Sequence, residues 1–520
     1  MLPDRATLAR LLAVPAIALA VYLLVFHRLA ERGLWSSHEA RAGLNASWYL
    51  RNPGWGPSFL PDGTPELQKP PLSYWLIAGT ARLLGEEHPG PLAIRLPSAV
   101  AAIVCAGCLV FLGIRTGNPR RGIVAGMMLL TMTHFTWLAR IARTDMPLAA
   151  AITAGCCCQV VIRREAGVAR HWAAFGLALA CAIGVMTKGP LAPVLLAAVG
   201  LGLSVFRARA TWAETMRHAA WLVLPVVAGA FACLPWFLEA DARTDGKFTE
   251  EFFWLHTWGR GMGGTRLREH PWWLYLVQGP FEALPWSLLL VPAIAWAVRR
   301  QGDATPVRRD ALDGIVWLAA ITGVLTAARF KRMDYLIPAF PAAAWVVACW
   351  WEARQMSLAL ARRRWEGGAL VAAMALVAAG WCFHIEWTLP ADNRLRDLGA
   401  MARSINEQVP GDETPVFFQL EQHELAYWLN RPLRTRIDWP ELASETDSKG
   451  AAWVVTARQR LAEGLFIEPG FAWKMLAERD PGRTLSLPDR ADLVLVRLER
   501  RSPASPVVLA SCPESPPSTR

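Results

Sequence analysis

The 520-residue sequence is poor in charge, at 19% charged residues, and it lacks an internal repeat, a disulfide framework and any Cys/His spacing typical of a metal site. The missing repeat argues against a transporter built from two related halves. Nine of the ten cysteines lie in apolar stretches, where cysteine behaves as a small apolar residue. Neither disulfides nor a bound metal is therefore expected to hold the fold together.

Apolar runs are what the sequence has in abundance: 53% of its residues are hydrophobic and the mean hydropathy is +0.25. A run of roughly 17–25 residues is long enough to cross a bilayer. The first run is followed by HRLAERGLW rather than by a small-residue cleavage site, which predicts an uncleaved anchor. We expect an α-helical polytopic membrane protein with eleven spans near 11–28, 95–114, 121–139, 146–163, 172–186, 189–206, 219–237, 273–297, 312–328, 334–352 and 366–384.

Arginine-rich segments occupy every second loop between these spans, as the positive-inside rule expects of cytoplasmic loops. The net charge of +11 is attributed to this bias rather than to nucleic-acid binding. The alternation agrees with a cytoplasmic N-terminus only if the short run 72–85, which follows Pro70 and Pro71, does not cross. That run is therefore predicted to be a half-helix, with twelve or thirteen spans as the alternatives.

The composition changes after about residue 385. We expect a transmembrane domain over 1–385 that includes an outer loop over 29–94, a soluble α/β domain over 386–500 and a disordered tail over 501–520. In the soluble domain the residue pattern predicts strands at 414–420, 451–458 and 491–499, and short helices at 424–430 and 457–465.

Three basic sites, around Lys69, Lys188 and Lys331, stand at outer helix ends and break the positive-inside pattern. Ionisable residues at such depths are costly and are usually functional, so their shared side predicts a site for an anionic headgroup such as phosphate. The simpler interpretation is that each lysine snorkels to the interface.

Acidic residues share that side. Glu39 follows His38, and Asp145 follows Arg143. A carboxylate beside a phosphate site could deprotonate an attacking hydroxyl. Asp145 could equally form a structural salt bridge with Arg140 or Arg143.

Several motifs together resemble the bacterial protein mannosyltransferase-like glycosyltransferases of the GT-C superfamily, which includes the aminoarabinose transferase acting on lipid A. The resemblance covers roughly residues 10–385. It rests on LWSSHEARAGLNASWYL (34–50), LQKPPLSYWLIAGTARLLG (67–85), AIRLPSAVAAI (93–103), ARTDMPL (142–148), GVMTKGPLA (184–192), FFWLHTWGR (252–260), HPWWLYL (270–276), LPW (284–286) and FKRMDYLIPAFPAAAW (330–345).

This resemblance implies a GT-C fold in a bacterial inner membrane, with the active site and the C-terminal domain on the periplasmic side. It implies a polyprenyl-phosphate sugar as donor and an inverting displacement toward a hydroxyl or phosphate acceptor on a lipid A-like lipid, a glycan or a protein. The partners expected are therefore this lipid-linked sugar, the acceptor and membrane lipids, with no nucleic acid and no resident cofactor. The need for a divalent cation stays open.

The resemblance also implies roles for individual residues. Such enzymes typically carry an Asp-Glu pair after the first span, where this chain has His38 and Glu39, so either residue is a candidate base. Gln68 stands where an acid often precedes Lys-Pro-Pro. The remaining candidates are Asp145 at the second acidic position, Lys69, Lys188, Arg260 and Lys331 on the donor phosphate, and Arg41, Arg143 and Tyr335 as supporting residues.

Two other functions fit a polytopic chain. An O-antigen ligase or polymerase also handles polyprenyl-linked glycans, but its main catalytic loop is expected late in the chain rather than after the first span. A transporter is expected to place ionisable groups near the middle of the bilayer on broken helices.

Overall fold

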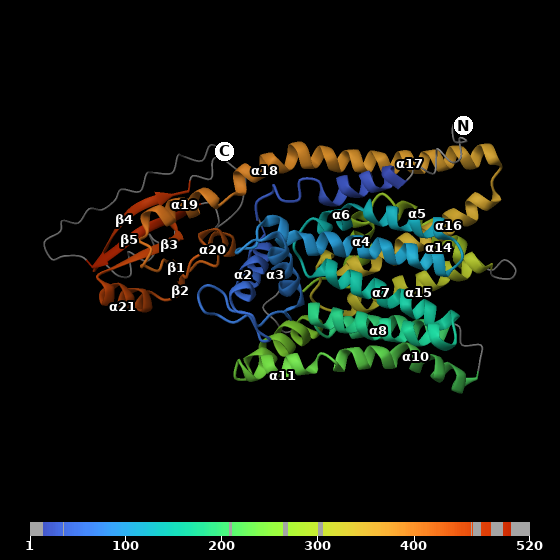
Figure 1. The fold of residues 1–520 in the computed structure, drawn as a ribbon, viewed down its shortest axis with the longest axis horizontal. Coiled ribbons are helices and arrows are strands. Elements are labelled where there is room, and N and C mark those ends of the chain that lie inside the picture. The colour runs from blue at the N-terminus through green and yellow to red at the C-terminus, as the bar shows by residue number, and fades with distance from the viewer. Residues whose placement is uncertain are drawn as a thin grey trace. The chain divides into compact units, whose positions relative to one another are not determined.

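The computed structural model describes residues 14–34, 36–206, 211–263, 269–299, 305–458, 460, 470–479 and 492–500. The chain divides into two compact units, Met1–Arg396 and Asp397–Arg520, and the first is helical while the second contains a sheet (Figure 1). This division falls beyond the expected boundary at 385, because the helix that starts at Leu360 continues through two further helical segments to Arg396.

The first unit consists of helices throughout its described part, with η marking π- or 3-10-helical segments. In chain order they are η1 (Tyr22–Phe26), α2 (Ser37–Arg51), α3 (Leu72–Leu84), α4 (Pro91–Arg115), α5 (Pro119–Leu130), α6 (Thr133–Ala139), α7 (Asp145–Arg164), α8 (Gly167–Lys188), α9 (Leu191–Phe206), α10 (Trp212–Phe231), α11 (Leu234–Ala242), η2 (Thr249–Gly259), α12 (Arg260–Met262), α13 (Leu274–Glu282), α14 (Ser287–Val298), α15 (Pro306–Ala327), η3 (Met333–Ala339), α16 (Phe340–Ser357), α17 (Leu360–Phe383), η4 (His384–Thr388) and α18 (Leu389–Arg396).

The prediction of a polytopic α-helical membrane protein is confirmed. Among the described residues, seven helices are long and apolar enough to cross a membrane, or up to nine if each of two bent pairs is one span. The bent pairs are α5 with α6, at 77°, and α13 with α14, at 116°. Each of the eleven predicted runs coincides with a long helix, a bent pair or one of the shorter apolar helices Val14–Phe26 and Leu191–Phe206. Fewer than eleven helices meet the length required to cross a membrane, because Val14–Phe26 and Leu191–Phe206 are too short and two spans are each broken into a bent pair.

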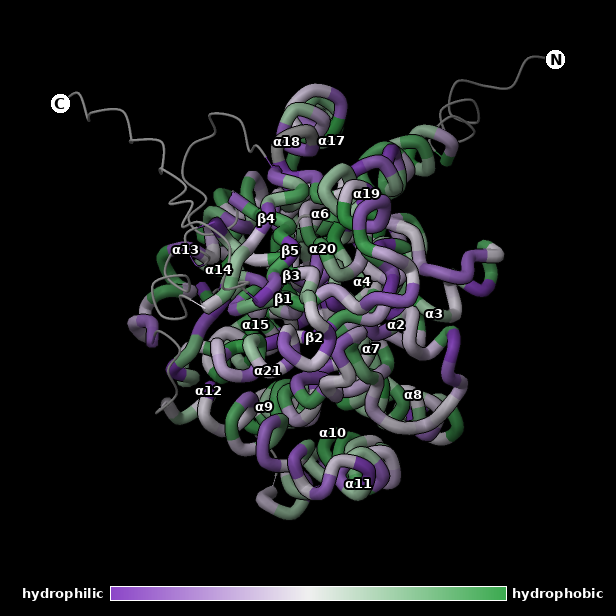
Figure 2. Tube along the Cα trace, turned by 90° about the vertical axis from the view of Figure 1, so that its left-hand side faces the viewer, coloured by the Kyte–Doolittle hydropathy of each residue, from purple (hydrophilic) through white to green (hydrophobic). Residues whose placement is uncertain are grey.

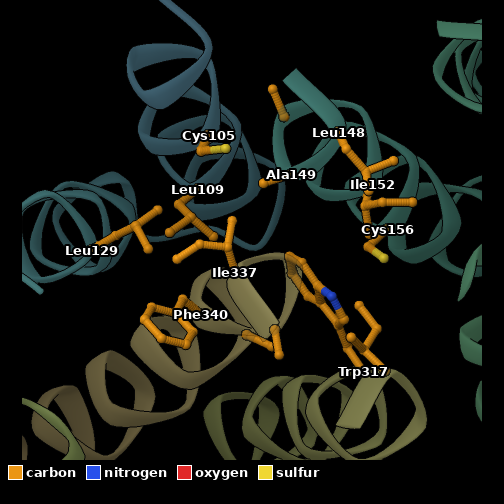
Figure 3. Packing of buried hydrophobic residues seen from close by; sticks show 14 of the residues in the cluster. Cys105, Leu109, Leu129, Leu148, Ala149, Ile152, Cys156, Trp317, Ile337 and Phe340 are labelled. Atoms are coloured by element: carbon orange, nitrogen blue, oxygen red, sulfur yellow. The ribbon is translucent and has the colours of Figure 1, made fainter. Parts of the chain in front are cut away.

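The centre of the bundle is a large apolar core to which α4, α7, η3 and α16 all contribute. Figure 3 shows Leu109 of α4 close to Ile337 of η3, while Leu148 and Ile152 lie together on α7. Hydrophobic residues also recur along outer helices such as α9 and α10 (Figure 2), which is expected of helices that face lipid.

Buried ion pairs join helices at the end of the bundle where α7 finishes. Arg121 lies 2.9 Å from Asp310, Arg163 lies 2.9 Å from Asp313, and Arg164 also pairs with Asp310. The sequence assigns these arginines to membrane orientation alone. The structure shows that they also neutralise aspartates of α15, because a carboxylate buried at that depth needs a partner.

The second unit is built on a five-stranded mixed sheet of order β2-β1-β3-β5-β4. β1 is parallel to β2 and β3, while β5 is antiparallel to β3 and β4. The predicted strands coincide with β1, β3 and β5, and the predicted helix 424–430 with α20. Most of 457–465 and the whole tail 501–520 lie outside the described residues. The elements are α19 (Gly399–Gln408), β1 (Val416–Phe418), α20 (His423–Leu429), β2 (Arg434–Arg436), α21 (Trp439–Lys449), β3 (Ala451–Ala457), β4 (Phe471–Glu478) and β5 (Leu493–Arg500).

Close approach of α8 and α10 gives a test of the packing. A Cβ atom added at Gly229 would lie 2.1 Å from the backbone oxygen of Ala178, whereas one added at Gly323 of α15 meets nothing within 4 Å. We expect Gly229→Ala to lower the free energy of unfolding by about 1–3 kcal/mol through overpacking. Gly323→Ala should be neutral or stabilising by up to about 1 kcal/mol, because alanine favours the helix. Thermal unfolding of both variants in detergent would contradict this packing if Gly229→Ala were as stable as Gly323→Ala.

Candidate functional site

Helix ends from distant parts of the chain meet around one cavity of about 350 Å³. The start of α2, the Lys69 segment before α3, the start of α7, the end of α8, α12 and the start of η3 all contribute to its wall. Of the residues expected at the site, the cavity is lined by His38, Lys69, Arg143, Asp145, Lys188, Arg260 and Tyr335. These positions span about 300 residues of sequence, so the convergence is a property of the fold.

Three cations in the wall are paired with carboxylates. Lys188 forms an ion pair with Asp145, and its Nζ lies 3.9 Å from the centre of the Tyr335 ring. Arg143 and Arg332 share Asp334, whose Oδ2 lies 3.4 Å from Arg332 Nη2. These pairs fix the cations in position, because charge-assisted hydrogen bonds hold flexible side chains in one geometry.

Two other cations in the wall have no carboxylate partner among the described residues: Lys69 and Arg260. Burial lowers the pKa of Lys69 to about 8, and neighbouring Lys188 and Arg41 act in the same direction against Glu66 and Asp145. Arg260 lies 5.5 Å from the ring centre of Phe330, and its Nε has no hydrogen-bond partner. A bound anion would supply the missing partner for both cations.

The turn after α8 brings Lys188 to the cavity. Gly189 ends the helix at φ +71°, a conformation that side chains other than glycine rarely adopt. A Cβ atom there would also lie 2.3 Å from Cζ of Phe252, which comes from η2 and lines the same cavity. Gly189 is thus required by both the turn and the packing of η2 over it.

His38 faces the cavity in its neutral form. Burial lowers the pKa of His38 to about 2, and Lys69, Arg143 and Arg332 lower it further. Its Nε2 lies 3.3 Å from Nη1 of Arg332, which can only donate, so Nε2 is the acceptor. A histidine in this state is a weak base at neutral pH.

Glu39 does not line the cavity, although it was expected there as a candidate base. It is fully buried in the bundle, because adjacent residues of a helix point about 100° apart. Its carboxylate accepts hydrogen bonds from Arg32 at 2.8 and 2.9 Å, from Arg95 at 2.9 and 3.3 Å, and from the backbone N–H of Ala142 at 3.1 Å. Burial alone would raise the pKa of Glu39, but the two arginines outweigh it and lower the value to about 2. Glu39 therefore ties α2 to α4 and to the segment before α7.

Two further expected residues also lie outside this cavity. Lys331 is 3% exposed, and its Nζ donates to the backbone oxygens of Ala328 and, at 3.3 Å, His270. Arg41 lines a small adjoining pocket with His38, and its Nε lies 2.9 Å from Glu66. Both contacts hold loops that border the cavity.

The cavity also has an apolar side. Leu191 and Val194 of α9, Leu325 of α15 and Phe252 of η2 form this part of its wall. The cations and the apolar side chains together make the cavity amphipathic, which suits a ligand with a charged headgroup and a hydrocarbon tail.

Comparison with known proteins gives concordant results. Residues 68–236, which include Lys69, Asp145 and Lys188, match the family described as dolichyl-phosphate-mannose-protein mannosyltransferase. The crystal structure of ArnT from Cupriavidus metallidurans bound to undecaprenyl phosphate has the same fold, with a TM-score of 0.71 over 93% of this chain and 97% of that one, at 19% identity. The chain is therefore similar to this mannosyltransferase family over about a third of its length and shares its fold with ArnT.

The curated proteins similar to this chain include relatives of moderate identity. The undecaprenyl phosphate-α-4-amino-4-deoxy-L-arabinose arabinosyl transferase of Pseudomonas aeruginosa strain UCBPP-PA14 is 30% identical over 330 residues, which cover 62% of this chain and 56% of the relative. The enzyme of the same name from Aeromonas salmonicida strain A449 is 25% identical over 336 residues, which cover 64% of this chain and 59% of the relative. The chain thus spans little more than half the length of these relatives.

The cavity and its surroundings also contain residues that the sequence did not single out as site residues. Arg332 and His256 line it directly, while Asp334 and Glu66 stand behind it as partners of arginines. Arg332 is adjacent to Lys331, so the same sequence feature, a positive charge at a helix end, points to both residues. Nothing in the sequence indicates which of the two side chains turns inward. Among the described residues no group of three or more His, Cys, Asp or Glu side chains could hold a metal ion.

The environment of Glu39 predicts a structural effect of mutation. Glu39→Gln removes the negative charge that Glu39 places between Arg32 and Arg95 inside the bundle, so we expect a loss of about 3–5 kcal/mol in the free energy of unfolding. Because the pKa of Glu39 is lowered, its contribution is complete above about pH 4.5 and is lost as the pH falls toward about 2.

The matched control is Glu165→Gln, which breaks the half-exposed pair with Arg115 and should cost at most about 1 kcal/mol. Thermal unfolding in detergent measures both variants. A Glu39→Gln protein with normal stability and no activity would instead support Glu39 as the base.

Proposed function

We propose that the chain is a glycosyltransferase that moves a sugar from a polyprenyl-phosphate donor to an envelope acceptor. The observation that carries the proposal is a pair of cations, Lys69 and Arg260, that have no carboxylate partner among the described residues and stand in a cavity whose other side is apolar. A polyprenyl phosphate combines one anionic group with a long hydrocarbon chain and so fits both sides. The names of the curated relatives and of the bound ArnT structure support this donor class.

The cations suit the chemistry of the transfer. An acceptor oxygen forms a bond to the anomeric carbon while the bond from that carbon to the phosphate oxygen breaks, with inversion. The electron pair stays with the departing polyprenyl phosphate, which gains a negative charge. Lys69, Arg260 and the paired Lys188 would stabilise that charge as it develops, and this is where electrostatic catalysis is most effective.

The acceptor that fits best is already ionised. Asp145 is the one carboxylate among the described lining residues, and it is paired with Lys188. His38 is a weak base because of its lowered pKa, and Glu39 is turned away. An acceptor phosphate, as on a lipid A-like lipid, needs no base, whereas a hydroxyl acceptor does. A phosphate acceptor is therefore part of the proposal, with Asp145 orienting Lys188.

The proposed location is the outer face of a bacterial inner membrane. The arginine-rich connections after α4, α7 and α16 lie at helix ends remote from the cavity, which is bordered instead by the start of α7 and the end of α8. The positive-inside rule assigns the arginine-rich ends to the cytoplasm. The cavity would then open toward the periplasm, where lipid-linked sugars and envelope acceptors meet.

Transfer by the purified protein tests the proposal. We expect reconstituted wild-type protein to move sugar from undecaprenyl-phosphate aminoarabinose to a phosphorylated lipid A-like acceptor, and to leave a dephosphorylated acceptor unchanged. Lys69→Ala should reduce the rate at least about 100-fold, because one charge-assisted contact to the leaving phosphate is lost. Lys247→Ala removes an exposed lysine between α11 and η2 and is the matched control. Full activity of Lys69→Ala would contradict the phosphate-binding role.

The pH dependence follows from Lys69. Since its pKa is lowered to about 8, the ammonium form dominates below that pH, and the rate should fall as the pH rises through 8. Arginine stays protonated to much higher pH. A Lys69→Arg variant that retains activity should therefore keep its rate up to about pH 10. An identical fall in both proteins would show that another group titrates.

A further inference from the structure

A line of alternating charges runs from the cavity wall into the bundle. Arg143 and Arg332, which both line the cavity, are anchored on the same carboxylate, Asp334. Arg332 also donates to His38 at 3.3 Å. The position of Asp334 therefore decides where two of the cationic side chains point.

His134 of α6 holds Asp334 from behind. Its Nε2 lies 3.1 Å from Oδ1 of Asp334, and its Nδ1 lies 3.2 Å from Oε2 of Glu282. The Nε2 contact with Asp334 is a hydrogen bond, while Nδ1 lies within ion-pair distance of Glu282. The imidazole ring thus stands between the two carboxylates and keeps them apart. His134 is absent from the cavity lining, so it does not touch a bound ligand.

Two broken helices bring this line of residues together. His134 follows the break between α5 and α6, and Glu282 precedes the break between α13 and α14. The backbone N–H of Thr133 donates to the Leu284 oxygen at 3.0 Å, and Trp286 Nε1 donates to Thr131 Oγ1 at 2.8 Å. Each break thus satisfies polar groups of the other, as irregular backbone within a membrane bundle requires. The interlocked breaks set the distance between His134 and Glu282.

We propose that His134 is a positioning residue: it fixes Asp334 so that Arg143 and Arg332 present their guanidinium groups to the phosphate in the cavity. The inference rests on the proposed function for the identity of that phosphate. The arrangement of His134, Asp334 and the two arginines is independent of it.

The test is His134→Leu, measured in the full-length protein with undecaprenyl phosphate as the binding probe. We expect its affinity for the probe to fall about tenfold or more and the KM for the lipid-linked donor to rise in parallel, with kcat and the unfolding temperature little changed. Glu282→Gln, a milder change at the far end of the same line, should act in the same direction by about threefold. His171→Leu replaces an exposed histidine of α8 and is the matched control.

A second comparison asks whether His134 acts through the arginines. In an Arg143→Gln, Arg332→Gln background, adding His134→Leu should weaken probe binding no further, because the side chains it positions are gone. An equal tenfold loss in that background would overturn the proposal. The proposal would also be overturned if the folded fractions of His134→Leu and Glu282→Gln bound the probe with normal affinity and only the yield of folded protein fell.

A cryo-electron microscopy map of the variant separates the two proposals. If the wild-type protein bound no polyprenyl phosphate, the proposed function would fail, while displaced Arg143 and Arg332 side chains in His134→Leu would still support the positioning role. Unmoved arginines in that map would refute the positioning role whatever the wild-type protein binds. Should His134→Leu not fold, the affinity and map of Glu282→Gln decide.

Discussion

The constraint on which the site depends is the cost of holding positive charge in a half-buried cavity. A cation taken out of water without a partner is destabilising, so carboxylates stand beside most of the cations in this wall. Asp145 balances Lys188, and Asp334 balances Arg143 and Arg332. Lys69 and Arg260 are the exceptions among the described residues. These two buried charges lower the stability of the fold, and a bound phosphate would neutralise them. Under the proposed function, this imbalance is the source of the affinity for an anion.

The helical architecture makes this balance possible because the paired charges of the cavity wall stand near helix ends and breaks. A side chain in the middle of an apolar span has no polar neighbours, whereas a helix end exposes backbone groups and admits loops from elsewhere in the chain. Lys188 stands at the end of α8 and Asp145 at the start of α7, so their pairing joins two neighbouring spans. The breaks in α5–α6 and α13–α14 create additional helix ends within the bundle, and His134 uses one of them.

This origin explains how much the sequence could predict. Spans, three of the five strands and the helix-end cations Lys69 and Lys188 follow from local patterns: run length, β-branched and aromatic runs, and charge beside proline or glycine. Arg260 is expected only from the family resemblance. Partners do not follow, because Glu39 meets Arg95 of a span and His134 meets Glu282, contacts separated by 56 and 148 residues. Local patterns also fail to separate neighbours. His38 and Glu39, like Lys331 and Arg332, are adjacent and of similar polarity, yet one member of each pair lines the cavity and the other supports it.

The histidine at position 38 connects the charge balance to the choice of acceptor. Two phosphates, one leaving and one attacking, would have to approach the same anomeric carbon, and they repel each other. A carboxylate at position 38 would add a third negative charge beside Lys69, whereas neutral His38 adds none. Among the described lining residues, five cationic side chains then face a single carboxylate. Such a cavity would lack a side chain that acts as a general base, but it would attract two anions at once. Under the proposed function, an acceptor that arrives ionised needs no base and is drawn in by the cations, so histidine at position 38 fits a phosphate acceptor better than a hydroxyl.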